Sequence, residues 1–135
     1  MQATFSLANF WRDYHYQNYL DHNTFLPLIN NELGKNNYTQ AYKDNFLKVK
    51  HFYVFGSRDD EIIQPWFSSF FAQYADGDQD IIVAMRNTTL YQNDTFGLRT
   101  LYEEGRMTLK EVPKVSHCDW HNATIFTDYV LDYLY

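Results

Sequence analysis

Two short apolar segments, each followed by a loop with ionisable side chains, limit the folds open to this chain. Residues 51–55, HFYVF, are rich in β-forming side chains and end at Gly56, which predicts a buried strand. Residues 107–112 alternate as MTLKEV and predict a second sheet strand. Because helical patterns lie before, between and after these segments, we predict an α/β fold with a parallel sheet flanked by helices. Ligands of such sheets bind at the carboxyl ends of the strands, where both loops lie.

The remaining elements follow from local patterns. We expect short helical pieces and loops in residues 5–34, and then a helix that has Thr39 as its N-cap. Its apolar side comprises Ala41, Tyr42, Phe46, Leu47 and Val49. Next come a short strand, one or two helical turns ended by Gly105, and a C-terminal amphipathic helix, at residues 81–85, 98–104 and 119–135. The apolar side of the C-terminal helix comprises Ile125, Phe126, Tyr129, Val130, Tyr133 and Leu134.

Composition excludes several classes of protein. A length of 135 residues suits one domain or part of a larger one, and 45% hydrophobic with 19% aromatic residues is a globular composition. The formal charge of −6 argues against nucleic acid as a main partner, because phosphate binding relies on basic patches. No run of 18 apolar residues is present, so we expect no transmembrane segment.

Glycosylation acceptor patterns are more frequent than the composition predicts. Asn-x-Ser/Thr occurs at Asn37, Asn87, Asn93 and Asn122, whereas the Asn, Ser and Thr content predicts about one occurrence. This excess favours a chain that passes through the secretory pathway; an Asn-rich cytosolic protein is the alternative. The first residues lack the features of a signal peptide, so we expect that signal upstream of Met1.

The segment KVSHCDWHNATIF, residues 114–126, allows several kinds of chemistry. His117 and His121 are spaced to share a helix face as metal ligands, but zinc sites need further protein ligands and the helix begins between the two histidines. Cys118 is a potential nucleophile, but adjacent residues generally point apart and so do not form a Cys–His pair. We therefore expect no metal, and a buried or inert cysteine or one paired outside the chain.

A third interpretation of His117 uses its distance from Asp60. Asp60 follows the first strand, and His117 follows the strand at residues 107–112. In α/β-hydrolases the acid and the base of a Ser…Asp…His triad lie on loops after successive late strands. The alternative is that Asp59 and Asp60 are turn residues and that His117 caps the last helix. The spacing alone leaves both interpretations open.

Five motifs, in one order, resemble the C-terminal half of the palmitoyl-protein thioesterases, most closely their branch of lysosomal acyl-thioesterases. They are FLPLINNE, KDNFLKV, DDEIIQPWFSSFF, TLYQNDTFGLRTLYEEG and VSHCDWHNAT, which begin at residues 25, 43, 59, 89 and 115. Together they extend over nearly the whole chain. The resemblance implies the C-terminal half of an α/β-hydrolase fold, with residues 1–50 as a cap-like helical segment and residues 51–135 as part of the core.

The resemblance also implies a function. The family cleaves long-chain acyl groups, chiefly palmitoyl, from thiols, in the lysosomal lumen or as secreted glycoproteins and without a cofactor. The family acid lies five residues before the proline of the acidic loop, which is Pro65, and so corresponds to Asp60. The family base lies in a Ser-His motif and corresponds to His117. Asp59 and His121 then lie outside the triad, and the family's sequon in the cap segment corresponds to Asn37.

Two motifs of the family are absent from this sequence. No serine has the flanking glycines of Gly-x-Ser-x-Gly, and the glycine-rich oxyanion segment is also absent. Leu33 and Cys118 are atypical for their motifs. We therefore expect the nucleophile in an N-terminal half outside these residues, and no activity from the chain alone. The alternatives are an inactive truncated fragment, an acyl-binding module, and a cytosolic binding domain. Aromatic residues in segments 10–19 and 66–74 either line an acyl groove or belong to the core.

Overall fold

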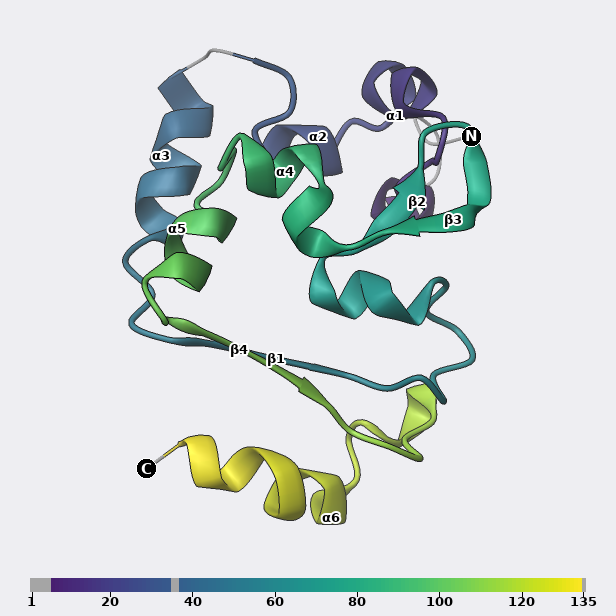
Figure 1. Ribbon diagram of the computed structural model, residues 1–135, viewed down its shortest axis with the longest axis vertical. Helices are drawn as coiled ribbons and strands as arrows, with labels where there is room; N and C mark the ends of the chain where they lie inside the picture. Colours follow the sequence, from purple (N-terminus) through teal and green to yellow (C-terminus); the bar gives the residue numbers. More distant parts are fainter. Residues whose placement is uncertain (1–5, 35–36, 135) are drawn as a thin grey trace.

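A parallel pair of strands lies between the C-terminal helical turns and the rest of the chain (Figure 1). The computed structural model describes residues 6–34 and 37–134. Strand β1, Phe52–Gly56, pairs in parallel with strand β4, Met107–Glu111. The mixture of helices with a parallel sheet confirms the predicted α/β class.

The register of this pair brings the carboxyl ends of its strands together. Gly56 lies opposite Glu111, at the end of each strand. The prediction of a strand at residues 51–55 was therefore offset by one residue. It was wrong about burial, since only Gly56 of β1 is fully buried and the other four residues are partly exposed.

Side chains of β1 alternate between two faces of the pair, as the pleat of a strand requires. On one face, the rings of Tyr53 and Phe55 lie 4.8 and 5.9 Å from the ring of Tyr133 near the C-terminus. On the other face, the ring of Phe52 lies 5.5 Å from that of Phe46. The strand pair is thus covered on both faces by helical segments, in the manner of a parallel sheet.

A glycine at the end of β1 lets the next segment approach closely. The 3₁₀ helix η2, Trp66–Phe70, packs against the strand end. A Cβ atom on Gly56 would lie 2.8 Å from Cβ of Ser69 and 3.1 Å from the ring of Phe70. Because any side chain at Gly56 would displace η2, this glycine sets where the acidic loop between β1 and η2 returns to the body of the molecule.

The predicted strand at residues 81–85 lies in a separate hairpin. Strand β3, Asp78–Val83, pairs antiparallel with β2, Gln73–Ala75, and both lie away from the parallel pair (Figure 1). Gly77 connects them with φ of +74°, a conformation that glycine adopts readily. The side chain of Ile81 is 55% exposed, so the apolar run reflects β propensity rather than burial.

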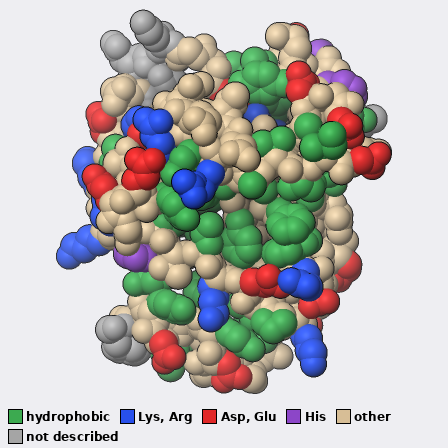
Figure 2. Space-filling view, viewed as in Figure 1, with side chains coloured by type: hydrophobic (Ala, Val, Ile, Leu, Met, Phe, Trp, Pro, Cys, Tyr) green, Lys and Arg blue, Asp and Glu red, His purple; other side chains and the backbone are tan. Residues whose placement is uncertain are grey.

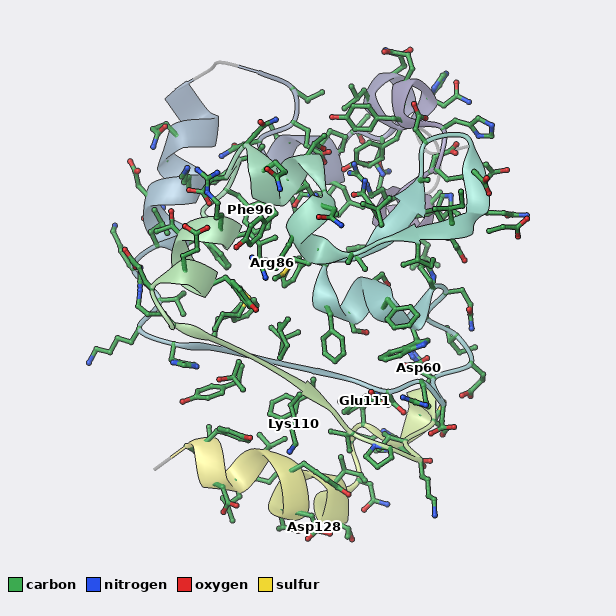
Figure 3. The ribbon with its side chains drawn as sticks, viewed as in Figure 1. Asp60, Arg86, Phe96, Lys110, Glu111 and Asp128 are labelled. Atoms are coloured by element: carbon green, nitrogen blue, oxygen red, sulfur yellow. The ribbon has the colours of Figure 1, made fainter. Side chains whose placement is uncertain are left out.

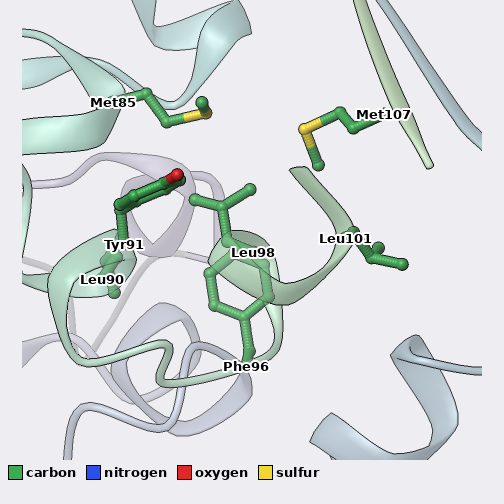
Figure 4. Packing of buried hydrophobic residues seen from close by; sticks show 7 residues of the cluster. All are labelled: Met85, Leu90, Tyr91, Phe96, Leu98, Leu101 and Met107. Atoms are coloured by element: carbon green, nitrogen blue, oxygen red, sulfur yellow. The ribbon is translucent and has the colours of Figure 1, made fainter. Parts of the chain in front are cut away.

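The core lies between β4 and the helices that precede it (Figure 4). These helices are η3, α4 and α5, at Met85–Asn87, Thr89–Gln92 and Leu98–Glu103. The buried cluster comprises Met85, Leu90, Tyr91, Phe96, Leu98, Leu101 and Met107. Helix α5 confirms the predicted helical turns, and Gly105 follows it with φ of +69°, as expected of a C-terminal glycine. The sequence analysis did not anticipate α4.

The N-terminal part contains the expected short helices. They are η1, α1, α2 and α3, at Ser6–Phe10, Tyr16–His22, Leu26–Ile29 and Asn37–Phe46. Helix α3 begins two residues before Thr39, so the predicted N-cap was wrong. Of the predicted apolar side, Phe46 and Leu47 pack against the core, whereas Ala41 and Tyr42 are exposed.

The predicted C-terminal helix is present over a shorter range and changes type along its length. After a separate 3₁₀ turn, η4, His117–Asp119, the chain is helical from residue 123 to 133, as α6, Ala123–Ile125, the π-helical η5, Phe126–Val130, and the 3₁₀ helix η6, Leu131–Tyr133. Asn122 starts a new helix because its side-chain oxygen accepts a hydrogen bond from the Thr124 N–H at 2.9 Å. Phe126 and Leu134 remain 45% and 57% exposed, so only part of the apolar side is covered. No helix within residues 6–34 and 37–134 is long and apolar enough to cross a bilayer.

Candidate active site

Two loops begin side by side where the parallel strands end. Figure 3 shows Asp60, from the loop after β1, near Glu111, the last residue of β4. The Val112 N–H donates to the Gly56 carbonyl at 2.9 Å and extends the pairing of the two strands by one residue. The strand register therefore brings together segments that are more than 50 residues apart in the sequence.

Side chains of the first loop tie the second loop to it. The hydroxyl oxygen of buried Ser57 accepts hydrogen bonds from the Asp59 and Val115 N–H groups, at 3.1 and 3.4 Å. Oδ2 of Asp59 accepts from the Lys114 N–H at 2.7 Å. Lys114 has φ of +60°, a left-handed conformation that is unfavourable for any residue other than glycine. These bonds fix the relative positions of the two loops.

The two predicted catalytic residues are in direct contact. Nδ1 of His117 lies 3.1 Å from both Oδ1 and Oδ2 of Asp60. Asp60 is 5% exposed, whereas the His117 side chain is 39% exposed. With Nδ1–H donating to a carboxylate, the imidazole has its lone pair on Nε2. In the described part of the chain, Nε2 has no hydrogen-bond partner, so it is available to a reacting group.

Hydrogen bonds keep Asp60 ionised. Burial by itself raises the pKa of a carboxyl group, and it is the largest single influence on Asp60. The combined donors outweigh it and hold the pKa of Asp60 below its ordinary value. They are the N–H groups of Ile63 and Ile62, at 2.9 and 3.1 Å from Oδ1, the His117 ring and the indole of Trp120.

Trp120 and Glu61 support the pair, and the sequence analysis missed both. Nε1 of Trp120 donates to Oδ2 of Asp60 at 3.2 Å, and Oε2 of Glu61 accepts from the His117 N–H at 3.3 Å. Trp120 ends a 3₁₀ turn that begins at His117, and side chains three residues apart in such a turn lie above one another. The three-residue spacing of His117 and Trp120 could have predicted that both face Asp60, but only if the 3₁₀ turn had been known in advance.

The other residues of the 114–126 segment lie outside the pair. Asp59 bonds Lys114, as described above, and His121 is exposed. Cys118 is free and exposed, so of the expected alternatives the buried cysteine was wrong, while an inert cysteine and one paired outside the chain stay predictions. The hydroxyl of Ser116 donates to Oδ2 of Asp119 at 2.7 Å. Within the described ranges, no group of three His, Cys, Asp or Glu side chains is arranged to hold a metal ion.

Comparison with known proteins identifies the family. The sequence profile of palmitoyl protein thioesterase matches residues 1–117. The chain belongs to this family. It is 41% identical over 131 residues to the lysosomal thioesterase PPT2-B of Xenopus laevis, which covers 96% of the chain and 44% of the relative. It is 38% identical over 124 residues to the human lysosomal thioesterase PPT2, which covers 90% of the chain and 40% of the relative.

A third relative extends this result to a distant organism. The palmitoyl-protein thioesterase 3 of Dictyostelium discoideum is 34% identical over 142 aligned residues, covering 99% of the chain and 47% of the relative. The chain therefore spans less than half the length of each of these three thioesterases. Family membership is thus shown for this part of the sequence.

The predicted glycosylation sites of this thioesterase-family chain are accessible where the structure describes them. Asn87, Asn93 and Asn122 are exposed, and Asn122 is also the N-cap of α6. The side chain of Asn37 lies outside the described part of the structure, although its backbone begins α3. Glycosylation of all four stays a prediction.

A groove and a small cavity adjoin η2, and a second cavity lies between the N-terminal segment and the β2–β3 hairpin. The groove has a volume of about 800 Å³ and is lined by Phe67 and Phe70 of η2, by Leu109 of β4 and by polar residues that include Arg86. Figure 2 shows hydrophobic side chains gathered in the middle of this face, with cationic side chains near them. The cavities measure about 210 and 110 Å³, and residues 10–14, together with Gln73 and Tyr74, contribute to their walls. Segment 66–74 thus contributes to the groove and to both cavities, whereas segment 10–19 contributes to the two cavities only.

Proposed function

We propose that this chain is the C-terminal part of an α/β-hydrolase that cleaves long-chain acyl thioesters, chiefly palmitoyl, with a Ser-His-Asp triad. The Asp60–His117 contact carries the proposal. A buried, ionised carboxylate holds Nδ1 of His117, while Nε2 stays accessible, and both residues lie on loops after neighbouring parallel strands. This arrangement matches the roles of acid and base in acyl transfer. Membership of the thioesterase family supports the reaction class.

The mechanism assigns each residue one role. Nε2 of His117 takes the proton from a serine hydroxyl as the serine oxygen attacks the thioester carbonyl. The resulting imidazolium is stabilised by Asp60 and then protonates the departing sulfur, which leaves as a thiol. In the second half-reaction His117 takes a proton from water, the water oxygen attacks the acyl-serine, and the serine regains its proton. A fatty acid is released, and no cofactor takes part.

The nucleophilic serine belongs, in this proposal, to sequence outside the 135 residues. None of the chain's five serines has the Gly-x-Ser-x-Gly pattern. Ser57 is buried and joins the two loops, and Ser116 donates to Asp119, so both hydroxyls already serve structural bonds. The reacting serine and its oxyanion donors therefore come from the part of the relatives that this chain does not span.

The acyl chain is assigned to the groove beside η2. Its volume is in the range of ligand sites, and Phe67, Phe70 and Leu109 offer it apolar surface. Each methylene moved from water onto such a surface contributes about 0.8 kcal/mol. The segment at residues 10–19 borders cavities of only about 210 and 110 Å³, so it is the weaker choice for an acyl site.

Paired substitutions test the function in a full-length form that carries Gly-x-Ser-x-Gly. Asp60→Asn should lower palmitoyl-CoA hydrolysis by about 10⁴-fold, as loss of a triad acid does. Asp59→Asn, the matched control, should lose less than about tenfold because Asp59 orders a loop rather than the base. Equal losses from the two substitutions would mean that the wrong carboxylate has been assigned.

The histidines provide the second comparison. His117→Ala should abolish hydrolysis while leaving the fold intact, since its ring is partly exposed; His121→Ala should leave most of the activity. A chelator should have no effect on the parent enzyme. Loss of activity with the chelator and recovery with zinc would contradict the triad. Acyl binding that survives in the absence of any hydrolysis would favour a non-catalytic acyl-binding module.

We further propose that the protein is a glycoprotein of the lysosomal lumen. The names of the Xenopus and human relatives and the exposure of Asn87, Asn93 and Asn122 support this location. Expression behind a signal peptide in eukaryotic cells should give a product whose mass falls on endoglycosidase treatment. Asn→Gln substitutions at the four sequons then identify the sites, with Asn37 expected to be occupied. An unchanged mass would remove the support that the sequons give to a lumenal protein.

A further inference from the structure

The loop that carries His117 bends sharply just before it. Lys114 has φ of +60°, so this bend persists only while other contacts hold the loop in place. The His117 side chain is 39% exposed, so packing around the ring restrains it only in part. Hydrogen bonds to the backbone of the loop therefore have a large share in positioning the imidazole.

Side chains of the first loop accept hydrogen bonds from the backbone of this second loop. Within the described ranges there are three such bonds, of 3.4, 2.7 and 3.3 Å, and their donors lie no more than three positions before His117. The acceptors are Ser57, Asp59 and Glu61, and the respective donors are the N–H groups of Val115, Lys114 and His117. Because Asp60 holds the imidazole, one short segment binds both the ring and the backbone of the base.

Ser57 links the two members of the catalytic pair. Its carbonyl oxygen accepts from the Asp60 N–H at 3.3 Å, and its hydroxyl oxygen accepts from the N–H of Val115, two residues before His117. Ser57 is 1% exposed and Val115 is fully buried, so water has little access to the second bond. Removing the hydroxyl would leave the buried Val115 N–H without its acceptor, which is costly. Its loss would therefore favour a shift of the second loop relative to Asp60.

Glu61 binds His117 itself. Its Oε2 accepts from the His117 N–H at 3.3 Å, and the side chain is exposed. His117 is the first residue of η4, and the first backbone donors of a helical turn find no partner within that turn. Glu61 supplies an acceptor from outside the turn and so fixes where η4 begins.

Small displacements of His117 matter for the proposed reaction. Nδ1 lies 3.1 Å from both carboxylate oxygens of Asp60, and Nε2 has to meet the serine hydroxyl at the same time. A misplacement of about 1 Å in a catalytic group can lower a rate about 100-fold. Side chains that hold the backbone of His117 therefore affect turnover without touching the substrate.

We propose that Ser57 and Glu61 are positioning residues that hold the backbone of His117 while Asp60 holds its ring. The proposal rests on the thioester hydrolysis proposed above. Ser57 acts through a buried bond and Glu61 through an exposed one. Both act as hydrogen-bond acceptors, so the oxygen atom of Glu61 matters rather than its negative charge. Asp59 holds the loop farther from His117 along the chain, so a smaller effect is expected of it.

Hydrolysis of palmitoyl-CoA by the full-length form measures both roles. Ser57→Ala should lower kcat about tenfold, and Glu61→Ala, which removes an exposed bond, should lower it about fourfold. KM should change less than about twofold in both variants, because neither residue lines the acyl groove. Glu61→Gln keeps an oxygen acceptor and should keep kcat within about twofold of the parent value.

Ser116→Ala is the matched control for Ser57→Ala. Ser116 directly precedes His117, but its hydroxyl donates to Oδ2 of Asp119, at 2.7 Å and within the same loop. Because this bond does not join the two loops, its loss should lower kcat less than about twofold. Urea unfolding of each variant gives its folded fraction, so that kcat is compared per folded molecule. If Ser57→Ala does not fold, Glu61→Ala still decides the question, since Glu61 is exposed.

The outcomes separate this inference from the proposed function. Lower kcat in both alanine variants, with activity retained in Glu61→Gln, supports the positioning role. Unchanged kcat in both alanine variants, equal losses from Glu61→Gln and Glu61→Ala, or a rise in KM alone would overturn that role and leave the thioesterase function in place. Failure of the unmodified full-length form to hydrolyse palmitoyl-CoA would overturn the proposed function, and this inference with it.

Discussion

The indole N–H of Trp120 offers a sharp test of how Asp60 is held. Oδ2 of Asp60 accepts from Trp120 at 3.2 Å and from His117 at 3.1 Å, whereas both backbone donors bind Oδ1. Trp120→Phe keeps an aromatic ring and removes one of the two donors to Oδ2. The carboxylate would then be free to rotate away from the geometry that orients His117.

The size of the effect follows from the kind of bond lost. A hydrogen bond to a charged group contributes about 1.5–3 kcal/mol, and the length of this one and the partial exposure of Trp120 favour the lower end. A loss of about 1.4 kcal/mol in orienting His117 corresponds to a tenfold decrease in kcat/KM. Trp120→Phe should therefore lower kcat/KM about tenfold, far less than the decrease expected from Asp60→Asn.

The same bond contributes to stability in a pH-dependent way. The folded-state pKa of Asp60 lies below its ordinary value of 3.8, so the carboxylate stabilises the fold above that pH. This contribution is lost as the pH falls through the lowered pKa. Removing the Trp120 donor raises the pKa of Asp60 in the folded protein. Urea unfolding should thus show a loss of about 1 kcal/mol at pH 7 that diminishes below about pH 4.

A double-mutant cycle measures whether Trp120 acts through Asp60. In an Asp60→Asn background, Trp120→Phe should lower the residual kcat/KM less than twofold, because the carboxylate that it orients is gone. If the two substitutions multiply, with Trp120→Phe still costing tenfold, then Trp120 acts by another route. The assay is steady-state hydrolysis of palmitoyl-CoA by the full-length form.

Three further substitutions test the scaffold by urea unfolding. Gly56→Ala should lower the free energy of unfolding by about 1–3 kcal/mol, because its Cβ would lie 2.8 Å from Ser69. Gly77→Ala should lower it by about 1 kcal/mol, because Gly77 has a positive φ but open space around it. A larger loss from Gly77→Ala than from Gly56→Ala would contradict the close approach of η2. Asp94 is 7% exposed, accepts from Thr100 Oγ1 at 2.6 Å and pairs with Lys43 at 2.9 Å. Burial alone would raise the pKa of Asp94, but the Thr100 and Lys43 donors outweigh burial and lower it. Asp94→Asn should therefore lower the free energy of unfolding by about 3 kcal/mol at pH 7, and by less below the ordinary pKa of 3.8. A cost that does not vary between pH 7 and pH 3 would refute the assigned charge state.

Local sequence patterns determined the class of the fold and the two loops that matter. The runs at residues 51–55 and 107–112 mark strands because β-branched and aromatic residues favour the pleated backbone. Helical patterns between them imply a crossover, and a crossover makes the strands parallel. Parallel strands end at the same edge, so Asp60 and His117 were predictable as neighbours without any knowledge of their contacts.

The tertiary structure decided what local patterns leave open. The apolar run at residues 81–85 resembles β1 in its β-forming residues, yet it pairs with β2 in a hairpin. Which strand pairs with it depends on the turn at Gly77, which brings β2 within reach. The C-terminal segment has helical periodicity from residue 119, but its helix starts only at residue 123, because the side chain of Asn122 caps it there.

The site shows the same division at the level of single atoms. Residue types and order made Asp60 and His117 candidates, because a triad needs a carboxylate and an imidazole on neighbouring loops, and the family resemblance favoured them over the alternative of turn and cap residues. The sequence could not identify Trp120 as a donor to Asp60, because this contact depends on turn type rather than on spacing. The sequence thus indicated which residue types could react, and the long-range packing determined which donors contact them.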